Sequence, residues 1–244
     1  KFGGVVALPA GFSVRANAGQ ANRAPSFLEL YVAQGTLIPN PNLRPERALF
    51  ADAALSHKTA FTSASVGGFY SLYEDLISYE LYPPMLAKPF NFRTARVYGL
   101  EAEGDVRPRS WLSASAGYTL MFSQNLRDDA RFYLKELPYR PRHKLSARVS
   151  GGPRIFRGTV EVLAQSEQFL NRTDTLTLPA RAFVNAGVSS VVHQSPEVTV
   201  SGELKNVFDQ QAADLDGYPL PGRAAYVTLS VAMDGRESGK GQQQ

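Results

Sequence analysis

Hydrophobic and polar residues alternate along most of this chain with a period of two, which predicts β-strands with one apolar and one polar face. The pattern is clearest near the end, where residues 198–205 read Val-Thr-Val-Ser-Gly-Glu-Leu-Lys and residues 225–232 read Ala-Tyr-Val-Thr-Leu-Ser-Val-Ala. The polar face carries Glu203 and Lys205 in mid-strand. Burying each ion unpaired in a sandwich core would cost several kcal/mol, whereas a water-filled interior imposes no comparable cost. The pattern therefore predicts hydrocarbon outside and water inside, as in a transmembrane β-barrel.

The same alternation recurs through the chain and predicts about ten strands of about ten residues, the length that a tilted strand needs to cross a bilayer. The segments are 12–19, 49–56, 63–72, 98–103, 112–120, 144–149, 159–165, 182–189, 198–205 and 225–233. Residues 1–8 are expected to be the last part of an earlier strand that ends in a turn at 9–11. No helical period competes with these strands, so no helix is expected.

The predicted connections alternate between short turns and long loops. The short ones lie near 57–60, 105–110, 150–154 and 193–195, and the long ones cover 20–45, 73–92, 123–140, 167–179 and 206–223. Short turns at one rim and long loops at the other are typical of outer-membrane barrels, with the turns in the periplasm and the loops outside the cell. Aromatic residues near the strand ends are expected to form girdles at the lipid headgroups. They are Tyr70, Tyr73, Trp111, Tyr118, Phe122, Phe156 and Phe169.

The amino-acid composition excludes several classes of protein. Hydrophobic residues make up 43% of the chain and the mean hydropathy is -0.22, which alternation explains by diluting the apolar signal. No run approaches the roughly 18 apolar residues of a membrane helix, so a helical membrane protein is excluded. The chain has no cysteine, which excludes disulfides and thiolate metal sites. The net charge of +4 comes from scattered Lys and Arg without a basic run, so nucleic acid is not an expected partner.

The two ends of the chain carry separate expectations. Because the chain begins at Lys1 and shows no signal peptide, it is expected to be a processed product or a fragment of a longer barrel protein. Residues 234–244 are polar and Gly-rich, so they are expected to form a disordered tail after a barrel portion at 1–233.

Five segments carry recognisable motifs. Residues 22–30 read Asn-Arg-Ala-Pro-Ser-Phe-Leu-Glu-Leu, residues 40–46 read Asn-Pro-Asn-Leu-Arg-Pro-Glu, and residues 138–143 read Pro-Tyr-Arg-Pro-Arg-His. Asn91, Ala95, Gly99, Glu101 and Glu103 are spaced along one strand, and Leu-Lys-Asn-Val-Phe-Asp at 204–209 is followed by Pro-Gly-Arg at 221–223. In this order over nearly the whole chain, they resemble the C-terminal half of TonB-dependent outer-membrane receptors, the active importers of siderophores, cobalamin and other scarce nutrients.

The resemblance implies an all-β, antiparallel transmembrane barrel of roughly 22 strands filled by an N-terminal plug. This chain would supply about ten C-terminal strands and no plug. It further implies the outer membrane of a Gram-negative bacterium, with lipid and lipopolysaccharide around the barrel and the TonB-ExbB-ExbD system acting through the missing plug. The motif residues are expected to be structural rather than ligand-binding, with prolines where strand pairing stops. They are Arg23, Pro25, Glu29, Asn40, Pro41, Pro45, Glu46, Gly99, Glu101, Asn206, Phe208, Gly222 and Arg223.

The leading hypothesis is therefore an importer whose ligand, such as an iron chelate or cobalamin, binds among the long loops. Aromatic faces for stacking and arginines for an anionic chelate define the candidate site. The candidates are Tyr79, Tyr82, Phe90, Tyr133, Tyr218, Arg127, Arg131 and Arg172. Surface aromatics without a ligand role are an equally open interpretation.

Two other classes stay open. One is a self-contained small barrel that acts as a passive pore or translocator. The other is a barrel enzyme, which would need an Asp-His or Ser-His pair at one rim, built on His143 or His193. We expect no enzyme, because the acidic pairs are consecutive and point apart. The three histidines share no metal-ligand spacing, so no metal or other cofactor is expected.

Overall fold

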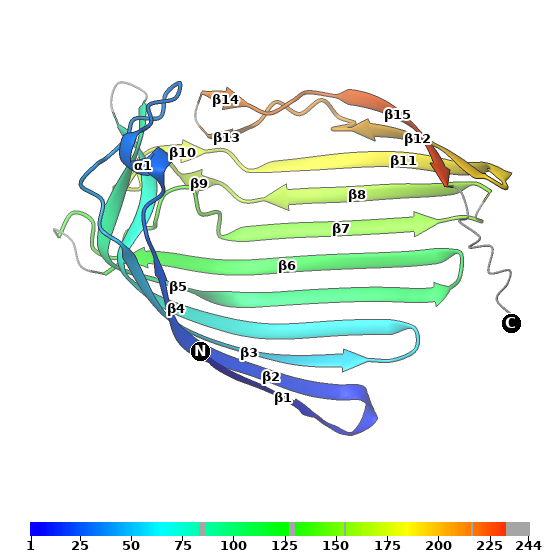
Figure 1. Ribbon diagram of the computed structural model, residues 1–244, viewed down its shortest axis with the longest axis horizontal. Helices are drawn as coiled ribbons and strands as arrows, with labels where there is room; N and C mark the ends of the chain where they lie inside the picture. Colours follow the sequence, from blue (N-terminus) through cyan, green and yellow to red (C-terminus); the bar gives the residue numbers. More distant parts are fainter. Residues whose placement is uncertain (83–85, 127–129, 154, 216, 233–244) are drawn as a thin grey trace, which may run out of the picture.

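The computed structural model describes residues 1–82, 86–126, 130–153, 155–215 and 217–232. Eleven strands form one antiparallel sheet in the order β1-β2-β3-β4-β5-β6-β7-β8-β11-β12-β15 (Figure 1). These strands are β1 (Phe2–Ala7), β2 (Phe12–Arg23), β3 (Glu46–Lys58), β4 (Thr62–Tyr82), β5 (Leu86–Arg109), β6 (Leu112–Asn125), β7 (His143–Gly151), β8 (Arg157–Gln165), β11 (Arg181–Gln194), β12 (Glu197–Lys205) and β15 (Ala224–Ala232). Two ribbons within the long loops pair β9 (Gln168–Phe169) with β10 (Thr177–Leu178), and β13 (Ala213–Leu215) with β14 (Tyr218–Pro219).

All ten predicted segments are strands over their described residues, and the sheet has eleven strands because residues 2–7 add β1, as expected for the end of an earlier strand. The turn at 9–11 is a single 3-10 turn, η1 (Pro9–Gly11). The short turns all lie at one end of the sheet and the long connections at the other (Figure 1). The up-and-down topology and the two unequal rims predicted from the sequence are therefore confirmed.

Two expectations about the region after Tyr73 are wrong. Residues 73–82 and 86–92 are not loop, because β4 continues through 21 residues to Tyr82 and β5, which has 24, begins at Leu86, so the two strands project beyond the rest of the sheet. Tyr73 is not a girdle residue either, because it packs against a buried cluster at the long-loop end. This cluster consists of Leu76, Phe92, Ala95, Val97 and Leu137.

The expectation of no helix is wrong at one place, where α1 (Phe27–Tyr31) forms five residues of helix. Ser26 accepts a hydrogen bond from the Glu29 N–H, and the Glu29 carboxylate accepts one from the Ser26 N–H, so a capping box holds this turn. A single turn fixed by its cap leaves no helical period to detect in the sequence. No helix in the described ranges has the length and apolarity to span a membrane.

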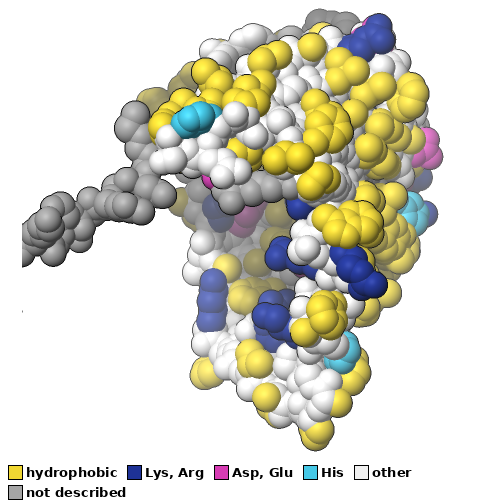
Figure 2. Space-filling view, turned by 90° about the vertical axis from the view of Figure 1, so that its right-hand side faces the viewer, with side chains coloured by type: hydrophobic (Ala, Val, Ile, Leu, Met, Phe, Trp, Pro, Cys, Tyr) yellow, Lys and Arg dark blue, Asp and Glu magenta, His cyan; other side chains and the backbone are white. Residues whose placement is uncertain are grey.

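The two faces of the sheet differ in polarity as the alternation predicts. Large apolar side chains on the outer flank are exposed, with Val66 at 58%, Leu100 at 53% and Val149 at 51%. Their neighbours on the strands point to the inner face, where Glu101 and Arg148 line hollows and Ser65 lies opposite Glu103. Figure 2 views the short-turn end and shows hydrophobic side chains over the flank, with charged side chains inside the hollow. We call these surfaces the outer face and the inner face.

The sheet is curved but not closed. β1 pairs with β2 alone and β15 pairs with β12 alone, so each edge strand has one neighbour among the described residues. The curved sheet is an arc of a barrel with two open edges (Figure 1).

Candidate functional site

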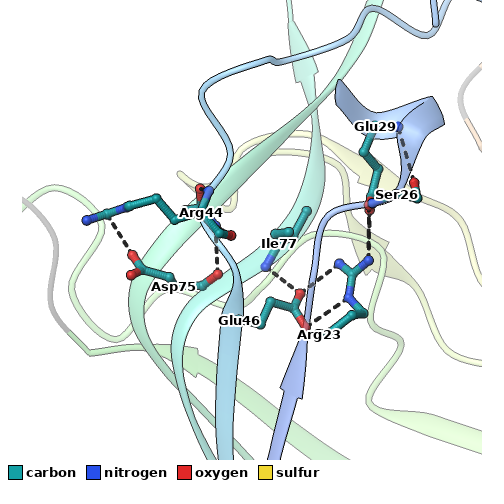
Figure 3. Close-up of polar contacts among 8 residues, drawn as sticks. Arg23, Ser26, Glu29, Arg44, Glu46, Asp75 and Ile77 are labelled. Atoms are coloured by element: carbon teal, nitrogen blue, oxygen red, sulfur yellow. Dashed lines mark hydrogen bonds and ion pairs between the residues drawn. The ribbon is translucent and has the colours of Figure 1, made fainter. Parts of the chain in front are cut away.

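Arg23 joins three segments at the long-loop end of the sheet. It is the last residue of β2 and lies directly opposite Glu46, the first residue of β3. Its Nε and Nη2 donate to the two Glu46 oxygens at 3.0 and 2.8 Å. Its Nη1 donates to the two Glu29 oxygens at 3.1 and 3.0 Å (Figure 3). The guanidinium fork thus ties helix α1 to the ends of two strands.

Both carboxylates of this group have further partners. Glu46 accepts the buried Ile77 N–H at 2.6 Å, and Glu29 accepts the Ser26 N–H at 2.7 Å. Burial by itself raises the pKa of Glu29, but hydrogen bonds from Ser26 and the charge and hydrogen bonds of Arg23 outweigh it and leave the pKa below its usual value. Glu29 is therefore charged under ordinary conditions, and both acids act as structural acceptors. We call Arg23, Ser26, Glu29, Glu46 and Ile77 the rim clamp.

The loop that follows α1 is fastened to the β4–β5 hairpin by amide groups. Asn91 accepts the Arg44 N–H at 2.8 Å and donates to the carbonyls of Arg44 at 3.0 Å and Asp75 at 2.7 Å. The Arg44 side chain pairs with Asp75 at 2.6 Å. Asn40 donates to the Pro89 carbonyl at 2.9 Å. The loop is therefore held at several points.

The three motif prolines lie where strand pairing is absent. Pro25 separates β2 from α1, Pro41 lies in the loop, and Pro45 immediately precedes β3. Proline has no N–H to donate to a neighbouring strand. Their positions agree with the sequence-based expectation.

A second fastening closes the last long loop. Asn206 is buried, donates to the carbonyls of Gln210 at 3.0 Å and Pro221 at 3.4 Å, and accepts the Gln210 N–H at 2.9 Å. The Arg223 N–H donates to Asp209 at 2.6 Å. A Cβ added at Gly222 would lie 2.7 Å from the same carboxylate, so a side chain at this position would have to displace the acceptor of the Arg223 N–H. The closing motif thus shapes the loop, while the Phe208 side chain is 76% exposed.

Gly99 and Glu101 lie on the inner face of β5. Phe69 lies opposite Gly99, and a Cβ added there would come within 2.0 Å of the Leu120 carbonyl oxygen and 2.9 Å of the Phe69 ring. Glu101 lines a hollow of about 530 Å³ together with Lys144 and Arg181. Gly99 therefore has a packing role, and Glu101 adds charge to the hollow interior.

Among the ligand candidates, the structure brings Phe90 and Arg172 together and adds Glu80, which the sequence did not indicate. Arg172 lies 2.5 Å from Glu80, and its guanidinium is 5.3 Å from the Phe90 ring centroid and 4.7 Å from that of Phe132. Arg131 lies 5.5 Å from the Phe132 centroid. The charge of Arg172 is thus already matched by a carboxylate.

Loops 126–142 and 167–179 are joined beside this group. Asp174 accepts the Glu136 N–H with both oxygens at 3.2 Å. Burial raises the pKa of Asp174. The sequence carries no signal for these contacts, because they join loops far apart along the chain.

The remaining candidates are dispersed. Tyr79 is half-buried and within electrostatic range of Glu29, whereas Tyr133 is 55% exposed. Tyr218 accepts hydrogen bonds from the N–H and the hydroxyl of Thr36 at 3.2 and 3.0 Å, which lower its pKa. Arg127, the Tyr82 side chain and the predicted tail at 234–244 lie outside the described residues.

The two histidines considered for a barrel enzyme have other ring partners. The His143 ring lies 2.7 Å from the Tyr118 hydroxyl, and the His193 ring lies 2.7 Å from the Pro196 carbonyl oxygen. In the described ranges, neither ring contacts an aspartate or a serine hydroxyl at hydrogen-bond distance. The geometry gives the enzyme hypothesis no support.

Comparison with known proteins relates this sheet to a family of β-barrel receptors. The family described as TonB dependent receptor-like, beta-barrel, matches residues 1–207. The copper transporter OprC superposes with a TM-score of 0.71 and 17% identity over 91% of this chain and 37% of the transporter. A variant of the ferric enterobactin receptor PfeA from Pseudomonas aeruginosa gives 0.67 and 18% over 92% and 38%. The ferric yersiniabactin uptake receptor FyuA from Yersinia pestis gives 0.66 and 15% over 93% and 34%.

The chain therefore spans well under half the length of these solved structures. At such low sequence identity, the structural similarity shows the fold alone. The family match, in contrast, covers most of the chain, including the rim clamp. The open arc, the exposed apolar outer face and the polar interior are parts of one barrel architecture. This chain belongs to the TonB-dependent receptor β-barrel family.

Proposed function

We propose that this chain is the C-terminal part of the barrel of an active importer in the outer membrane of a Gram-negative bacterium. The observation that carries the proposal is the family match over residues 1–207, combined with a sheet that is apolar outside and charged inside. Lipid satisfies the first face and water the second. Energy would come from the TonB-ExbB-ExbD system through an N-terminal plug in the full receptor.

The open sheet favours this proposal over a self-contained small barrel. Unpaired N–H and C=O groups at β1 and β15 would each cost several kcal/mol in hydrocarbon. Further strands in the full receptor would satisfy them, in keeping with the 34% to 39% of the similar receptors that this chain covers. A passive pore made of this chain alone would have to leave both edges unpaired or pair them with each other.

The proposed ligand is a metal chelate, with an iron chelate first. Three of the similar structures are named as receptors for ferric enterobactin, ferric yersiniabactin and a siderophore, and a fourth as a copper transporter. The long-loop end offers aromatic faces and cations that suit an aromatic, anionic chelate. We propose Tyr79, Tyr82, Phe90, Tyr133, Tyr218, Arg127 and Arg131 as the ligand candidates, and cobalamin as a second candidate ligand.

Uptake by the full receptor in a host that lacks its own siderophore receptors tests the proposal. The probes are radiolabelled ferric enterobactin, ferric yersiniabactin, copper and cobalamin. We expect accumulation of at least one probe that disappears when TonB is deleted. Equal accumulation with and without TonB would indicate a passive pore, and no accumulation of any of the four would reject this ligand range.

Loop variants then test the site. Alanine at both Tyr79 and Tyr82 in the full receptor is expected to weaken binding of the transported probe by about tenfold, the effect of losing stacking contacts worth roughly 1.4 kcal/mol. Phenylalanine at Tyr118, which lies on the outer face, is the matched control and should leave affinity unchanged. Unchanged affinity of the double alanine variant would remove these two residues from the site.

A further inference from the structure

A row of aromatic rings crosses the outer face of the sheet near its long-loop end. Tyr70, Tyr98 and Phe122 occupy directly opposed positions on β4, β5 and β6. The ring centroids are 6.4 Å apart for Tyr70 and Tyr98 and 5.3 Å apart for Tyr98 and Phe122. Such rings mark the level at which a membrane protein meets lipid headgroups.

Two guanidinium groups lie on adjacent rings of this row. Arg96 is 5.5 Å from the Tyr98 centroid, and Arg142 is 5.4 Å from the Phe122 centroid. A guanidinium stacked on a ring keeps its N–H edge available for a planar acceptor. The two cations and the two rings form one surface, which we call the outer-face belt: Arg96, Tyr98, Phe122 and Arg142.

Among the residues that the structure describes, Arg96 has no anionic partner. Its Nε and Nη2 both donate to the neutral Gln124 side-chain oxygen, at 2.8 and 2.6 Å. Over the ranges that the structure describes, this amide and the Tyr98 ring are its hydrogen-bond and ring partners. Arg142, in contrast, is paired with Glu136. The belt therefore carries a positive charge that the described residues do not neutralise.

The position of Arg96 along β5 places this charge at the edge of the apolar band. Arg96 lies four residues from Leu100 on the same face, which corresponds to about 13 Å along a strand toward the long loops. A charged side chain facing hydrocarbon is costly, whereas at the interface it meets phosphate and water. The geometry suits an anion at headgroup level.

We infer that the outer-face belt binds the phosphate group of an anionic glycolipid in the surrounding leaflet. Arg96 would donate its free N–H groups to phosphate oxygens, and the stacked rings would pack against the sugar. The inference rests on the proposed function, because it requires the long-loop end to face the glycolipid leaflet of an outer membrane. It assigns this role to the lipid-facing surface and to no residue of the ligand region.

Retention of diphosphoryl lipid A by the full receptor tests the inference. The purified receptor is titrated with diphosphoryl lipid A in detergent, and bound lipid is counted by native mass spectrometry. Arg96→Gln is expected to weaken retention by about tenfold, as for the loss of one charge-assisted contact. The control Arg148→Gln changes an arginine of the inner face and should leave retention unchanged. Monophosphoryl lipid A should bind more weakly than the diphosphoryl form.

Three outcomes decide the inference. Equal retention by the wild type and Arg96→Gln would overturn it, as would equal loss in Arg148→Gln or displacement of lipid A by millimolar inorganic phosphate. If Arg96→Gln does not fold, Arg96→Lys supplies the comparison, because it keeps the charge but loses the fork, and it should retain lipid A several-fold more weakly than the wild type. Retention is measured without transport, so a receptor that imports none of the probes can still show Arg96-dependent binding.

Discussion

Arg23 and Glu46 face each other at the ends of adjacent strands, joined by two hydrogen bonds of 3.0 and 2.8 Å. The Arg23 side chain is 45% exposed and that of Glu46 only 10%. Solvent screens the guanidinium side of the pair, so its Coulomb energy contributes little to stability. The larger effect of Glu46 comes from its other contact, because it also accepts the buried Ile77 N–H.

Replacing Glu46 by alanine is therefore expected to lower the free energy of unfolding of the full receptor by about 1–3 kcal/mol, the cost of leaving a buried donor unpaired. Glu46→Gln should cost less, because the amide oxygen still accepts from Ile77. Unfolding by guanidinium chloride in detergent measures the stability of both variants. The control Glu203→Ala removes an exposed acid paired with Lys205, and should change the free energy by under about 0.5 kcal/mol. Equal effects of Glu46→Ala and Glu203→Ala would contradict the assignment.

The lowered pKa of Glu29 predicts that acid releases helix α1 and the loop after it. A carboxylate whose folded pKa lies below its unfolded value, about 4.3, stabilises the fold above that value and loses this contribution as pH falls through the folded pKa. A spin label on Ala33→Cys should gain mobility as the pH falls below that unfolded value. In Glu29→Gln, label mobility should be raised at neutral pH and should change little with acid. A parallel pH response in both proteins would show that another group controls the loop.

Gly99 should tolerate no side chain, although its backbone conformation is an ordinary one. In Gly99→Ala, the new Cβ must displace the Leu120 carbonyl, which belongs to the β5–β6 pairing, so we expect a loss of about 1–3 kcal/mol from overpacking. The same substitution at Gly104 on β5 meets its nearest atom, the Ser63 oxygen, at 4.0 Å and should be accepted. Denaturant titration of the two variants compares them directly. Equal stability would mean that Phe69 and β6 adjust without cost.

The alternation at Ser65 and Val66 shows why most of the sheet could be predicted from the sequence. Each residue there faces a single solvent, water or hydrocarbon, so polarity alone decides its face. Beyond Tyr73 this simple relation fails, because loops cover both sides of the β4–β5 hairpin and bury neighbours such as Leu76 and Ile77 together. A segment covered by protein on both sides has no period of two, and was therefore mistaken for a loop.

The candidate site was predictable only in part, for a related reason. The motif residues Arg23, Glu29 and Glu46 could be recognised by their spacing. The spacing did not predict that the guanidinium of Arg23 would pair with both carboxylates. The pairing of Arg172 with Glu80 has no sequence signal at all, because it depends on how separate loops fold over one another. The loop aromatics were predicted from residue type alone. Residue type does not tell which loops lie side by side, so the prediction grouped residues that the structure disperses.

The assignment of the two faces predicts that lysine is costly at one position of β4 and tolerated at its neighbour. Val66→Lys puts a charge in the middle of the outer face between Leu55 and Ala102, which should cost about 2–4 kcal/mol in a bilayer. Ser65→Lys points inward, opposite Glu103, and should be close to neutral. Urea titration of both variants in lipid vesicles measures the difference. A larger loss for Ser65→Lys than for Val66→Lys would reverse the two faces.

The tip of the first long loop, at Gly35 and Thr36, should be held in place by Tyr218 of the last long loop. Thr36 donates two hydrogen bonds to the Tyr218 hydroxyl, and a Cβ added at Gly35, whose φ is +60°, would lie 2.7 Å from the same oxygen. Tyr218→Phe removes the acceptor, so we expect the label on Ala33→Cys to become several-fold more mobile at neutral pH.

Gly35→Ala should release the tip by pushing the hydroxyl away, in addition to straining its own backbone. Because both substitutions break the same contact, the double variant should be little more mobile than the stronger single variant. Two effects that simply add would show that Gly35 and Tyr218 act independently, and the tip would then be held by its pairing with Ala87 rather than by the tyrosine.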